Sequence, residues 1–329
     1  MEGEKIVEYR YIGNTGVKVS SLCFGTMSFG GIADEKTSLE MFHRCREVGI
    51  NFFDCANIYN GGRAEEILGK CIADCRDEVI ITSKVTMPVD RGLNNRGSSR
   101  RHIMLAVEDS LRRLKTDWID FYFIHEFDPH TPIEETLRAL DDLQRQGKIL
   151  YPAVSNWAAW QIAKALGISA KEGLAKFYCI QPMYNLVKRQ AEVEILPLAE
   201  AENLGVITYS PLGGGLLTGK YRKDGTGEGR LVEQDKYRKR YGEKSYFEIA
   251  ENFASFANEL GVHPATLAIA WVKAHPAVTA PIIGARNLEQ LEPALKAAEF
   301  TLTEELYERI SAFSPTPPPA HDRSEEVVS

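Results

Sequence analysis

The sequence of 329 residues lacks the segments that would place a protein in a membrane or outside a cell. No apolar run reaches the roughly 18 residues that a transmembrane helix needs, so we expect no membrane contact. The opening residues, MEGEKIVEYR, contain no apolar signal-peptide core, and the six cysteines fall at irregular spacings. These observations favour a cytoplasmic protein whose thiols are free.

Two classes of partner are disfavoured by what is missing. Cys71 and Cys75 are four residues apart, but no second Cys/His pair with zinc spacing follows them, so we expect no metal. The 39 lysines and arginines are interspersed with 46 acidic residues, giving a net charge of −7. Because a phosphate backbone requires a basic stripe, nucleic acid is a poor candidate partner, and we expect none.

The sequence does contain the material for one large α/β domain, since 44% of its residues are apolar and 26% are charged. Helical periodicity separates successive β-like runs, as in Ile103, Val107, Leu111 and Leu114. The eight runs are rich in β-branched and aromatic residues: SLCFG from Ser21, NFFD from Asn51, VIITS from Val79, IDFYFI from Ile119, YPAV from Tyr151, YCIQ from Tyr178, VITY from Val206 and PIIG from Pro281.

These runs are apolar almost throughout, which is typical of parallel strands buried on both faces. Eight alternating units predict a closed (β/α)₈ TIM barrel. A doubly wound open sheet is the structural alternative, but its GxGxxG dinucleotide fingerprint is absent, because the first run continues into FGTMSFGG. At the fourth crossover, Thr131-Pro132-Ile133-Glu134 predicts a helix start with Thr131 as the N-cap.

Three further segments complete the expected single barrel domain over residues 1–314. Two short β-like runs around Asn14-Thr15-Gly16 predict a hairpin that plugs one barrel end. After the seventh strand, residues 211–244 form a long segment rich in Gly, Lys and Arg, and loops of that length are usually functional. Residues 315–329 are Pro-rich and polar, so we expect a mobile tail.

Four titratable residues are expected at the carboxyl ends of the strands, where the loops of a (β/α)₈ barrel converge. Asp54, Lys84 and His125 end the second, third and fourth strands, and Tyr59 follows Asp54. Each has an ordinary structural explanation, since a strand-end Asp can cap a helix, a Lys can extend to solvent and a Tyr can pack. Taken together, they indicate a proton-transfer site.

The chemistry of that site follows from the acidity of a phenol. A phenol has a pKa of ~10, so Tyr59 benefits as a proton donor from a cation such as Lys84. Asp54 supplies the counter-ion that keeps a buried ammonium charged, and His125 can orient a substrate oxygen. The arrangement suits protonation of the oxyanion that forms when hydride attacks a carbonyl carbon.

Seven motifs occur in the chain in this order: FDCANIYNGGRAEEILG, ITSKV, DFYFIHEFDPHTPIEET, VSNW, IQPMYNLV, YSPLGGGLLTGKY and IIGARNLEQL. With them the chain resembles the aldo-keto reductase family, from about Tyr9 to Thr301. The resemblance places the family's catalytic tetrad on Asp54, Tyr59, Lys84 and His125, and implies NADPH-dependent reduction of aldehydes and ketones with Tyr59 as the proton donor. IIGAR aligns the chain with the bacterial-type and potassium-channel β-subunit-like branch.

The resemblance also implies a set of NADPH contacts, with Arg suited to a bidentate phosphate contact. Cys55 stands where the family usually has Thr or Ser, a change that we expect to be harmless. Pro293 and Ala294 stand where the branch commonly has Glu and Asn touching adenine. The implied contacts are Ser155, Asn156 and Gln181 for the nicotinamide carboxamide, Tyr209 stacked on its ring, Ser210, Pro211, Leu212, Gly213 and Gly215 with Lys220 and Arg230 for the pyrophosphate, and Gly284, Arg286 and Gln290 for adenosine and the 2′-phosphate.

Two other functions remain open on the sequence. The same fold and tetrad occur in channel β subunits, so an NADP(H)-sensing interaction module is the main alternative. An isomerase or aldolase using Lys84 as a Schiff base would need a lowered lysine pKa, which Asp54 opposes. The carbonyl substrate is not identified, because loops 86–99 and 211–244 wall the pocket, with Met87, Phe127 and Trp157 as candidate lining residues. The sequence does not indicate an oligomeric state.

Overall fold

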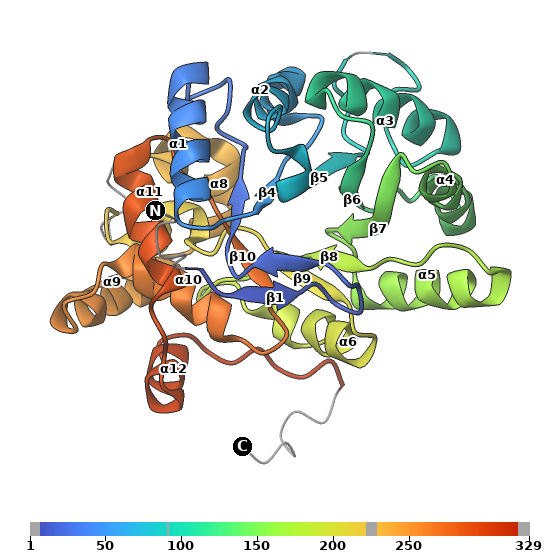
Figure 1. Ribbon diagram of the computed structural model, residues 1–329. Coiled ribbons are helices and arrows are strands. Elements are labelled where there is room, and N and C mark those ends of the chain that lie inside the picture. The colour runs from blue at the N-terminus through green and yellow to red at the C-terminus, as the bar shows by residue number, and fades with distance from the viewer. Residues whose placement is uncertain (1–6, 91, 222–228, 322–329) are drawn as a thin grey trace.

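The computed structural model of the protein describes residues 7–90, 92–221 and 229–321 and confirms the predicted closed barrel (Figure 1). Each of the eight apolar runs forms a parallel strand, and β10 pairs with β3 to close the ring. The strands are β3 (Cys23–Gly25), β4 (Phe52–Asp54), β5 (Ile80–Val85), β6 (Ile119–Ile124), β7 (Ile149–Ser155), β8 (Cys179–Gln181), β9 (Gly205–Thr208) and β10 (Ala280–Ile283).

Helices surround the barrel, and their apolar faces pack on the outer side of the strands. Helices α1 to α6 follow β3 to β8 in turn, and α11 follows β10. The α-helices are α1 (Glu35–Glu47), α2 (Arg63–Cys71), α3 (Arg100–Leu114), α4 (Ile133–Arg145), α5 (Ala159–Glu172), α6 (Ile195–Ala201), α7 (Arg230–Glu233), α8 (Asp235–Tyr241), α9 (Lys244–Glu259), α10 (Pro264–Ala274), α11 (Leu288–Leu295) and α12 (Glu304–Ser311). Short 3₁₀ helices are η1 (Tyr59–Gly62), η2 (Arg76–Glu78), η3 (Gln190–Glu192), η4 (Gly213–Thr218) and η5 (Lys296–Ala298).

The predicted hairpin is present as β1 (Tyr9–Tyr11) and β2 (Lys18–Ser20), paired antiparallel. Ile12 and Val19 are fully buried and pack with residues of the barrel interior such as Phe121. Backbone bonding joins the hairpin to the residues that lead into β9, since the N–H of Asn14 donates to the carbonyl of Asn203. The hairpin therefore closes the amino end of the barrel and leaves the carboxyl end for the site.

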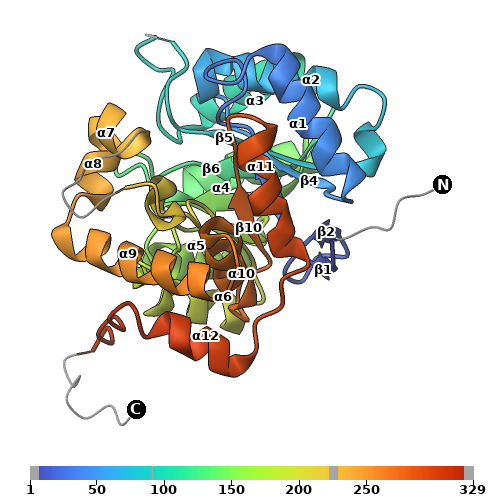
Figure 2. The ribbon, with the colours of Figure 1, turned by 90° about the vertical axis from the view of Figure 1, so that its left-hand side faces the viewer.

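The long segment after β9 is also present, and it carries η4, α7 and α8 rather than irregular chain alone. Figure 2 shows α7 and α8 on the side of the barrel away from the hairpin. Residues 222–228 and the side chain of Arg230 lie outside the described part of the chain, and so do residues 322–329 of the tail. Residues 315–321 form no helix or strand, and the mobility of the tail stays a prediction.

The predicted cap of α4 is wrong. Pro132, not Thr131, is the N-cap residue, and no side chain caps the helix. The Thr131 hydroxyl instead donates to the Asp128 carboxylate at 2.7 Å. Asp128 also accepts the backbone N–H of Ser98 and that of His130, so it holds the loop that precedes the helix. The bond to Asp128 therefore holds the Thr131 side chain in the loop before α4, and its oxygen accepts no N–H from the first turn.

The remaining expectations concern cysteines and membranes. All six cysteines are free thiols, and five of them are buried. Within the described residues, no helix has both the length and the apolar character needed to cross a bilayer.

Candidate active site

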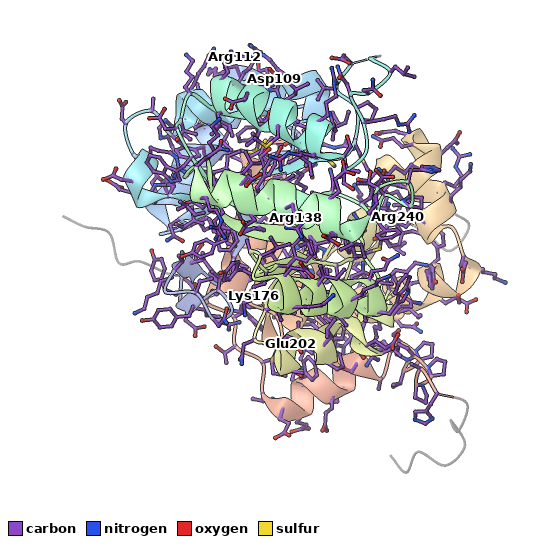
Figure 3. All side chains as sticks on the ribbon, turned by 90° about the vertical axis from the view of Figure 1, so that its right-hand side faces the viewer. Asp109, Arg112, Arg138, Lys176, Glu202 and Arg240 are labelled. Carbon is purple, nitrogen blue, oxygen red and sulfur yellow. The ribbon has the colours of Figure 1, made fainter. Side chains whose placement is uncertain are left out.

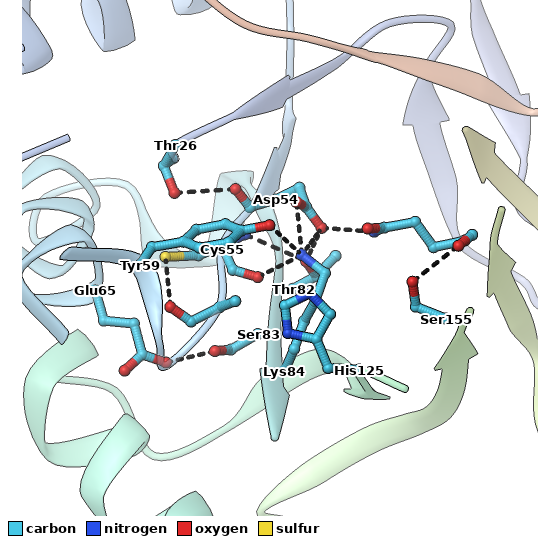
Figure 4. A network of polar contacts seen from close by, with 12 residues as sticks. Thr26, Asp54, Cys55, Tyr59, Glu65, Thr82, Ser83, Lys84, His125 and Ser155 are labelled. Atoms are coloured by element: carbon cyan, nitrogen blue, oxygen red, sulfur yellow. Dashed lines mark hydrogen bonds and ion pairs between the residues drawn. The ribbon is translucent and has the colours of Figure 1, made fainter. Parts of the chain in front are cut away.

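The four predicted residues meet at the carboxyl end of the barrel, where β4 and β5 bring Asp54 and Lys84 into contact (Figure 4). Lys84 is fully buried, and its Nζ donates to both carboxylate oxygens of Asp54 at 2.7 Å. The same Nζ donates to the carbonyl oxygen of Cys55 at 2.8 Å. Three acceptors therefore hold this ammonium in one position.

The Asp54 carboxylate is a shared acceptor. Its Oδ1 also accepts the hydroxyl of Thr82 at 2.7 Å and the side-chain amide of Gln181 at 2.8 Å. Burial lowers the pKa of Lys84, but the attraction of Asp54 outweighs burial and leaves the pKa above its usual value. Lys84 is thus charged at neutral pH, which argues against a Schiff-base role because a nucleophilic amine must be neutral.

Tyr59 comes from η1, just after β4, and its hydroxyl lies 3.4 Å from Nζ of Lys84. Burial raises the pKa of the Tyr59 phenol to about 12, and the lowering effect of Lys84 only partly offsets it. The phenol therefore keeps its proton at neutral pH. Such a group can donate a proton, and the ammonium beside it can stabilise the phenolate that remains.

His125 follows β6 directly and is 8% exposed. Its ring makes an edge contact with that of Tyr59, at a centroid distance of 6.2 Å. Burial, then the charges of Lys84 and Lys236, lowers the pKa of His125 to about 3. The imidazole is therefore neutral, and its buried Nδ1 has no hydrogen-bond partner among the described residues. A neutral ring can donate one hydrogen bond to a bound oxygen.

The residues predicted to contact the nicotinamide lie beside the tetrad. The Ser155 hydroxyl donates to the carbonyl of Gln181 at 2.8 Å, and the Tyr209 hydroxyl donates to Oδ1 of Asn156 at 2.7 Å. The amide of Asn156 donates to the carbonyl of His125 at 2.8 Å. Hydrogen bonds therefore connect this group to the tetrad. A cavity of about 310 Å³ is lined by Asn156, Gln181 and Tyr209 together with residues of α5 and α6 such as Ile162 and Ile195, and no tetrad residue lines it.

The predicted pyrophosphate residues form a compact turn after β9. Ser210, Gly213, Gly214 and Gly215 all have positive φ, at 58°, 57°, 68° and 97°. A run of this kind suits glycine and can present backbone N–H groups as an anion-binding concavity. The N–H groups of Gly213 and Gly215 already donate to the carbonyls of Ser210 and Leu212, which reduces the donors left for an anion. Pro211 and Leu212 occupy the same turn. Lys220 follows η4, with its side chain against Gly215 and its ammonium over the ring of Tyr221.

The predicted adenosine residues are brought together at the start of α11. The backbone N–H of Arg286 donates to Oε1 of Gln290 at 3.3 Å, and Gly284 follows β10. Nη2 of Arg286 lies 3.4 Å from Oε2 of Glu233 on α7. Nothing in the sequence indicated this carboxylate, because the partner of a surface arginine depends on how distant segments pack.

The departures from the family pattern have structural consequences. Pro293 lies inside α11, where its carbonyl accepts the hydroxyl of Thr266 at 2.6 Å, and Ala294 is buried. Cys55 is buried, and its contact with Lys84 is through its backbone carbonyl. Since every residue type has that carbonyl, this contact is retained when Cys replaces Thr or Ser.

Comparison with known proteins supports the resemblance seen in the motifs. Residues 21–315 match the model of the aldo/keto reductase family. The chain belongs to that family. This aldo/keto reductase is 40% identical over 322 residues to the uncharacterized oxidoreductase YrpG of Bacillus subtilis, covering 94% of this chain and 97% of the relative.

Two further relatives of the aldo/keto reductase have different names. A probable voltage-gated potassium channel subunit beta of Arabidopsis thaliana is 36% identical over 301 residues, covering 89% of this chain and 92% of the relative. Norsolorinic acid reductase of Aspergillus flavus is 33% identical over 318 residues, covering 92% and 79%. The predicted family and its channel-subunit-like branch are confirmed, and the family membership makes this protein an oxidoreductase.

Proposed function

We propose that this protein reduces aldehydes and ketones to alcohols, with NADPH as the hydride source and Tyr59 as the proton donor. The observation that carries the proposal is the buried Asp54–Lys84 pair, with the Tyr59 hydroxyl 3.4 Å from the ammonium. A protonated phenol beside a fixed cation is the arrangement that protonating a carbonyl oxyanion requires.

The residues after β7, β8 and β9 fit NADPH. Asn156, Gln181 and Tyr209 border the cavity. Their hydrogen bonds connect them to His125 and Asp54, so they offer amide groups and an aromatic face beside the tetrad, as a nicotinamide carboxamide and ring would need. The left-handed turn at residues 213–215 has no side chains, so a phosphate group can approach its backbone closely. When bound, NADPH supplies a hydride from its nicotinamide ring. The proposed contacts beyond this cavity include Ser155, Ser210, Lys220, Arg230, Gly284, Arg286 and Gln290.

The protein's side chains then carry the proton. Neutral His125 donates a hydrogen bond to the carbonyl oxygen of the substrate and orients it. As hydride adds to the carbonyl carbon, the C=O π electrons move to oxygen, and Tyr59 transfers its hydroxyl proton there. The products are an alcohol and NADP⁺, and the phenolate is stabilised by Lys84, which Asp54 keeps charged.

The decisive experiment offers the purified protein NADPH with aldehydes, ketones and quinones and follows NADPH absorbance. Oxidation of NADPH that depends on a carbonyl compound supports the proposal. Tight NADPH binding without turnover of any compound would favour the second candidate, an NADP(H)-sensing interaction module. That candidate draws on the relatives named as potassium channel subunits beta. A cytoplasmic location is part of the proposal and rests on the cysteine pattern.

A further inference from the structure

A fully buried carboxylate, Glu65, lies outside the tetrad but contacts the segments that carry it (Figure 4). Glu65 is in the first turn of α2, which follows the Tyr59 turn. It accepts the hydroxyl of Ser83, the residue before Lys84 on β5. Its Oε2 accepts Nε of Arg113, from α3, at 2.7 Å. We call Glu65, Ser83 and Arg113 the Glu65 network.

The chain after Tyr59 forms a left-handed turn that side chains from other segments contact. Asn60, Gly61 and Gly62 have φ values of 49°, 63° and 92°, all in the left-handed region. A continuous right-handed helix therefore does not connect Tyr59 to α2. The turn's own backbone bonds are short-range, since the N–H of Arg63 donates to the carbonyls of Tyr59 and Asn60. On one side, the Asn60 amide donates to two carbonyls in the loop after β3. The Glu65 network lies on the other side.

Arg113 holds the turn as well as the carboxylate. A Cβ placed at Gly62 would lie 2.8 Å from Cδ of Arg113, so the stem of this arginine rests directly on the turn. The Arg113 side chain is 19% exposed, whereas that of Arg112 is 73% exposed and pairs with Asp109 on the outer face of α3 (Figure 3). Two adjacent arginines thus have different roles, and only one faces the Tyr59 turn.

Stability alone is a poor explanation for this network. Removing charges from water is costly, and well-packed apolar residues often stabilise a fold at least as well as a buried ion pair. In some proteins a buried polar pair instead specifies one geometry. Geometry matters here, because the hydroxyl of Tyr59 and Nζ of Lys84 are 3.4 Å apart, near the limit of a hydrogen bond. A small displacement of the turn would break this contact.

We propose that Glu65 is a positioning residue: through Ser83 and Arg113 it fixes the Tyr59 turn against β5 and so sets the distance between the phenol and Lys84. The inference rests on the proposed role of Tyr59 as proton donor. Among the described residues, the Glu65 carboxylate bonds to Ser83 and Arg113 and to no tetrad side chain, so its effect passes through the position of Tyr59. Misplacement by about 1 Å can slow an enzyme by about a hundredfold.

The test compares Glu65→Gln with Asp120→Asn. Glu65→Gln keeps the shape and an acceptor for Ser83 but removes the charge facing Arg113. We expect kcat for aldehyde reduction to fall about tenfold or more, with KM and NADPH affinity close to wild type. Asp120 forms another buried pair, with Arg76, and also bonds to β5 through the N–H of Ile81, at the opposite barrel end. Its variant should lose stability while kcat stays within about twofold.

The two arginines of α3 provide a second matched pair. Arg113→Met should reproduce the kcat loss and Arg112→Met should not, while Arg113→Lys should restore part of it. Ser83→Ala removes only the hydroxyl that Glu65 accepts, and it replaces Glu65→Gln in the test if that variant does not fold. If kcat is unchanged in Glu65→Gln, the inference is overturned and Glu65 is a purely structural residue. If Glu65→Gln does not fold, an unchanged kcat in both Ser83→Ala and Arg113→Met has the same meaning.

A readout without turnover separates this inference from the proposed function. NMR of isotope-labelled tyrosine, with the Tyr59 signal assigned from Tyr59→Phe, reports the surroundings of the phenol directly. Glu65→Gln should shift the Tyr59 signal and its titration, and Asp120→Asn should leave both in place. If the wild-type protein reduces no carbonyl compound, the proposed function fails, and this signal still decides whether the Glu65 network positions Tyr59.

Discussion

Arg286 and Glu233 form an ion pair that joins the start of α11 to the end of α7, with Nη2 and Oε2 3.4 Å apart. The arginine is the residue that the family resemblance assigns to the 2′-phosphate of NADPH. A carboxylate therefore lies where a phosphate is expected to bind, and the two anions would compete for the same guanidinium.

The first prediction concerns Arg286→Ala. A charge-assisted contact with phosphate is worth roughly 1.5–3 kcal/mol, so NADPH binding should weaken about ten- to a hundredfold. NADH lacks the 2′-phosphate, and its affinity should barely change. Fluorescence quenching with each nucleotide measures the two effects. Equal losses for both nucleotides, or none for either, would show that Arg286 does not read the phosphate.

Glu233→Gln should have the opposite sign. Removing the carboxylate frees Arg286 and removes a repulsion toward the 2′-phosphate, so NADPH should bind more tightly. The pair is partly exposed, and exposed pairs contribute ~0.2–1 kcal/mol, so the gain should be at most about fivefold. The matched control is Glu248→Gln, which removes an exposed charge from α9. The same gain in both variants would indicate a general charge effect.

Tyr59→Phe tests the proton donor. The variant should keep its fold and nearly all its NADPH affinity, because the ring still packs beside His125. Carbonyl reduction should fall by about two to four orders of magnitude, as expected when a general acid is removed. Steady-state kinetics with binding titrations separate the two. Near-normal turnover would mean that another group supplies the proton.

Lys84→Met tests the cation. The substitution leaves Asp54 buried without its partner, which should destabilise the fold by about 3–5 kcal/mol. Reduction should also slow, since no ammonium would stabilise the phenolate. Denaturant unfolding and single-turnover rates measure the two losses, and Lys84→Arg is the control that retains the charge. A folded Lys84→Met variant with wild-type rates would remove Lys84 from the mechanism.

The pH dependence of reduction follows from two shifted groups. The pKa of His125 is lowered to about 3, so the imidazole stays neutral and the rate should show no inflection near 6.5, the ordinary histidine value. The pKa of Tyr59 is raised to about 12, so the rate should fall only as the pH rises toward that value and the phenol loses its proton. A pH profile of kcat between 5 and 10 tests both statements. An inflection near 6.5 that disappears in His125→Gln would contradict the first.

The barrel could be predicted because strands buried on both faces produce apolar runs that are easy to distinguish from amphipathic helices. The four tetrad residues were predictable for a related reason, since the carboxyl ends of parallel strands converge. Glu65 and Arg113 were not, because 48 residues separate them and a charged residue in a helix resembles any solvated one. The cap of α4 was wrongly predicted, since local sequence does not show that Asp128 binds the Thr131 hydroxyl.

The pairing of β3 with β10 determines when the chain can finish folding. Cys23 lies opposite Ile282, so the first barrel strand completes its pairing only when the last strand is available. Almost the whole sequence separates the two strands. Contacts of such long sequence separation slow folding, because the loop-closure entropy must be lost before they form. During synthesis, the edges of β3 and β9 remain unpaired until residue 283 has left the ribosome. A shorter nascent chain cannot close the barrel, and it leaves two strand edges unpaired, a feature that favours aggregation.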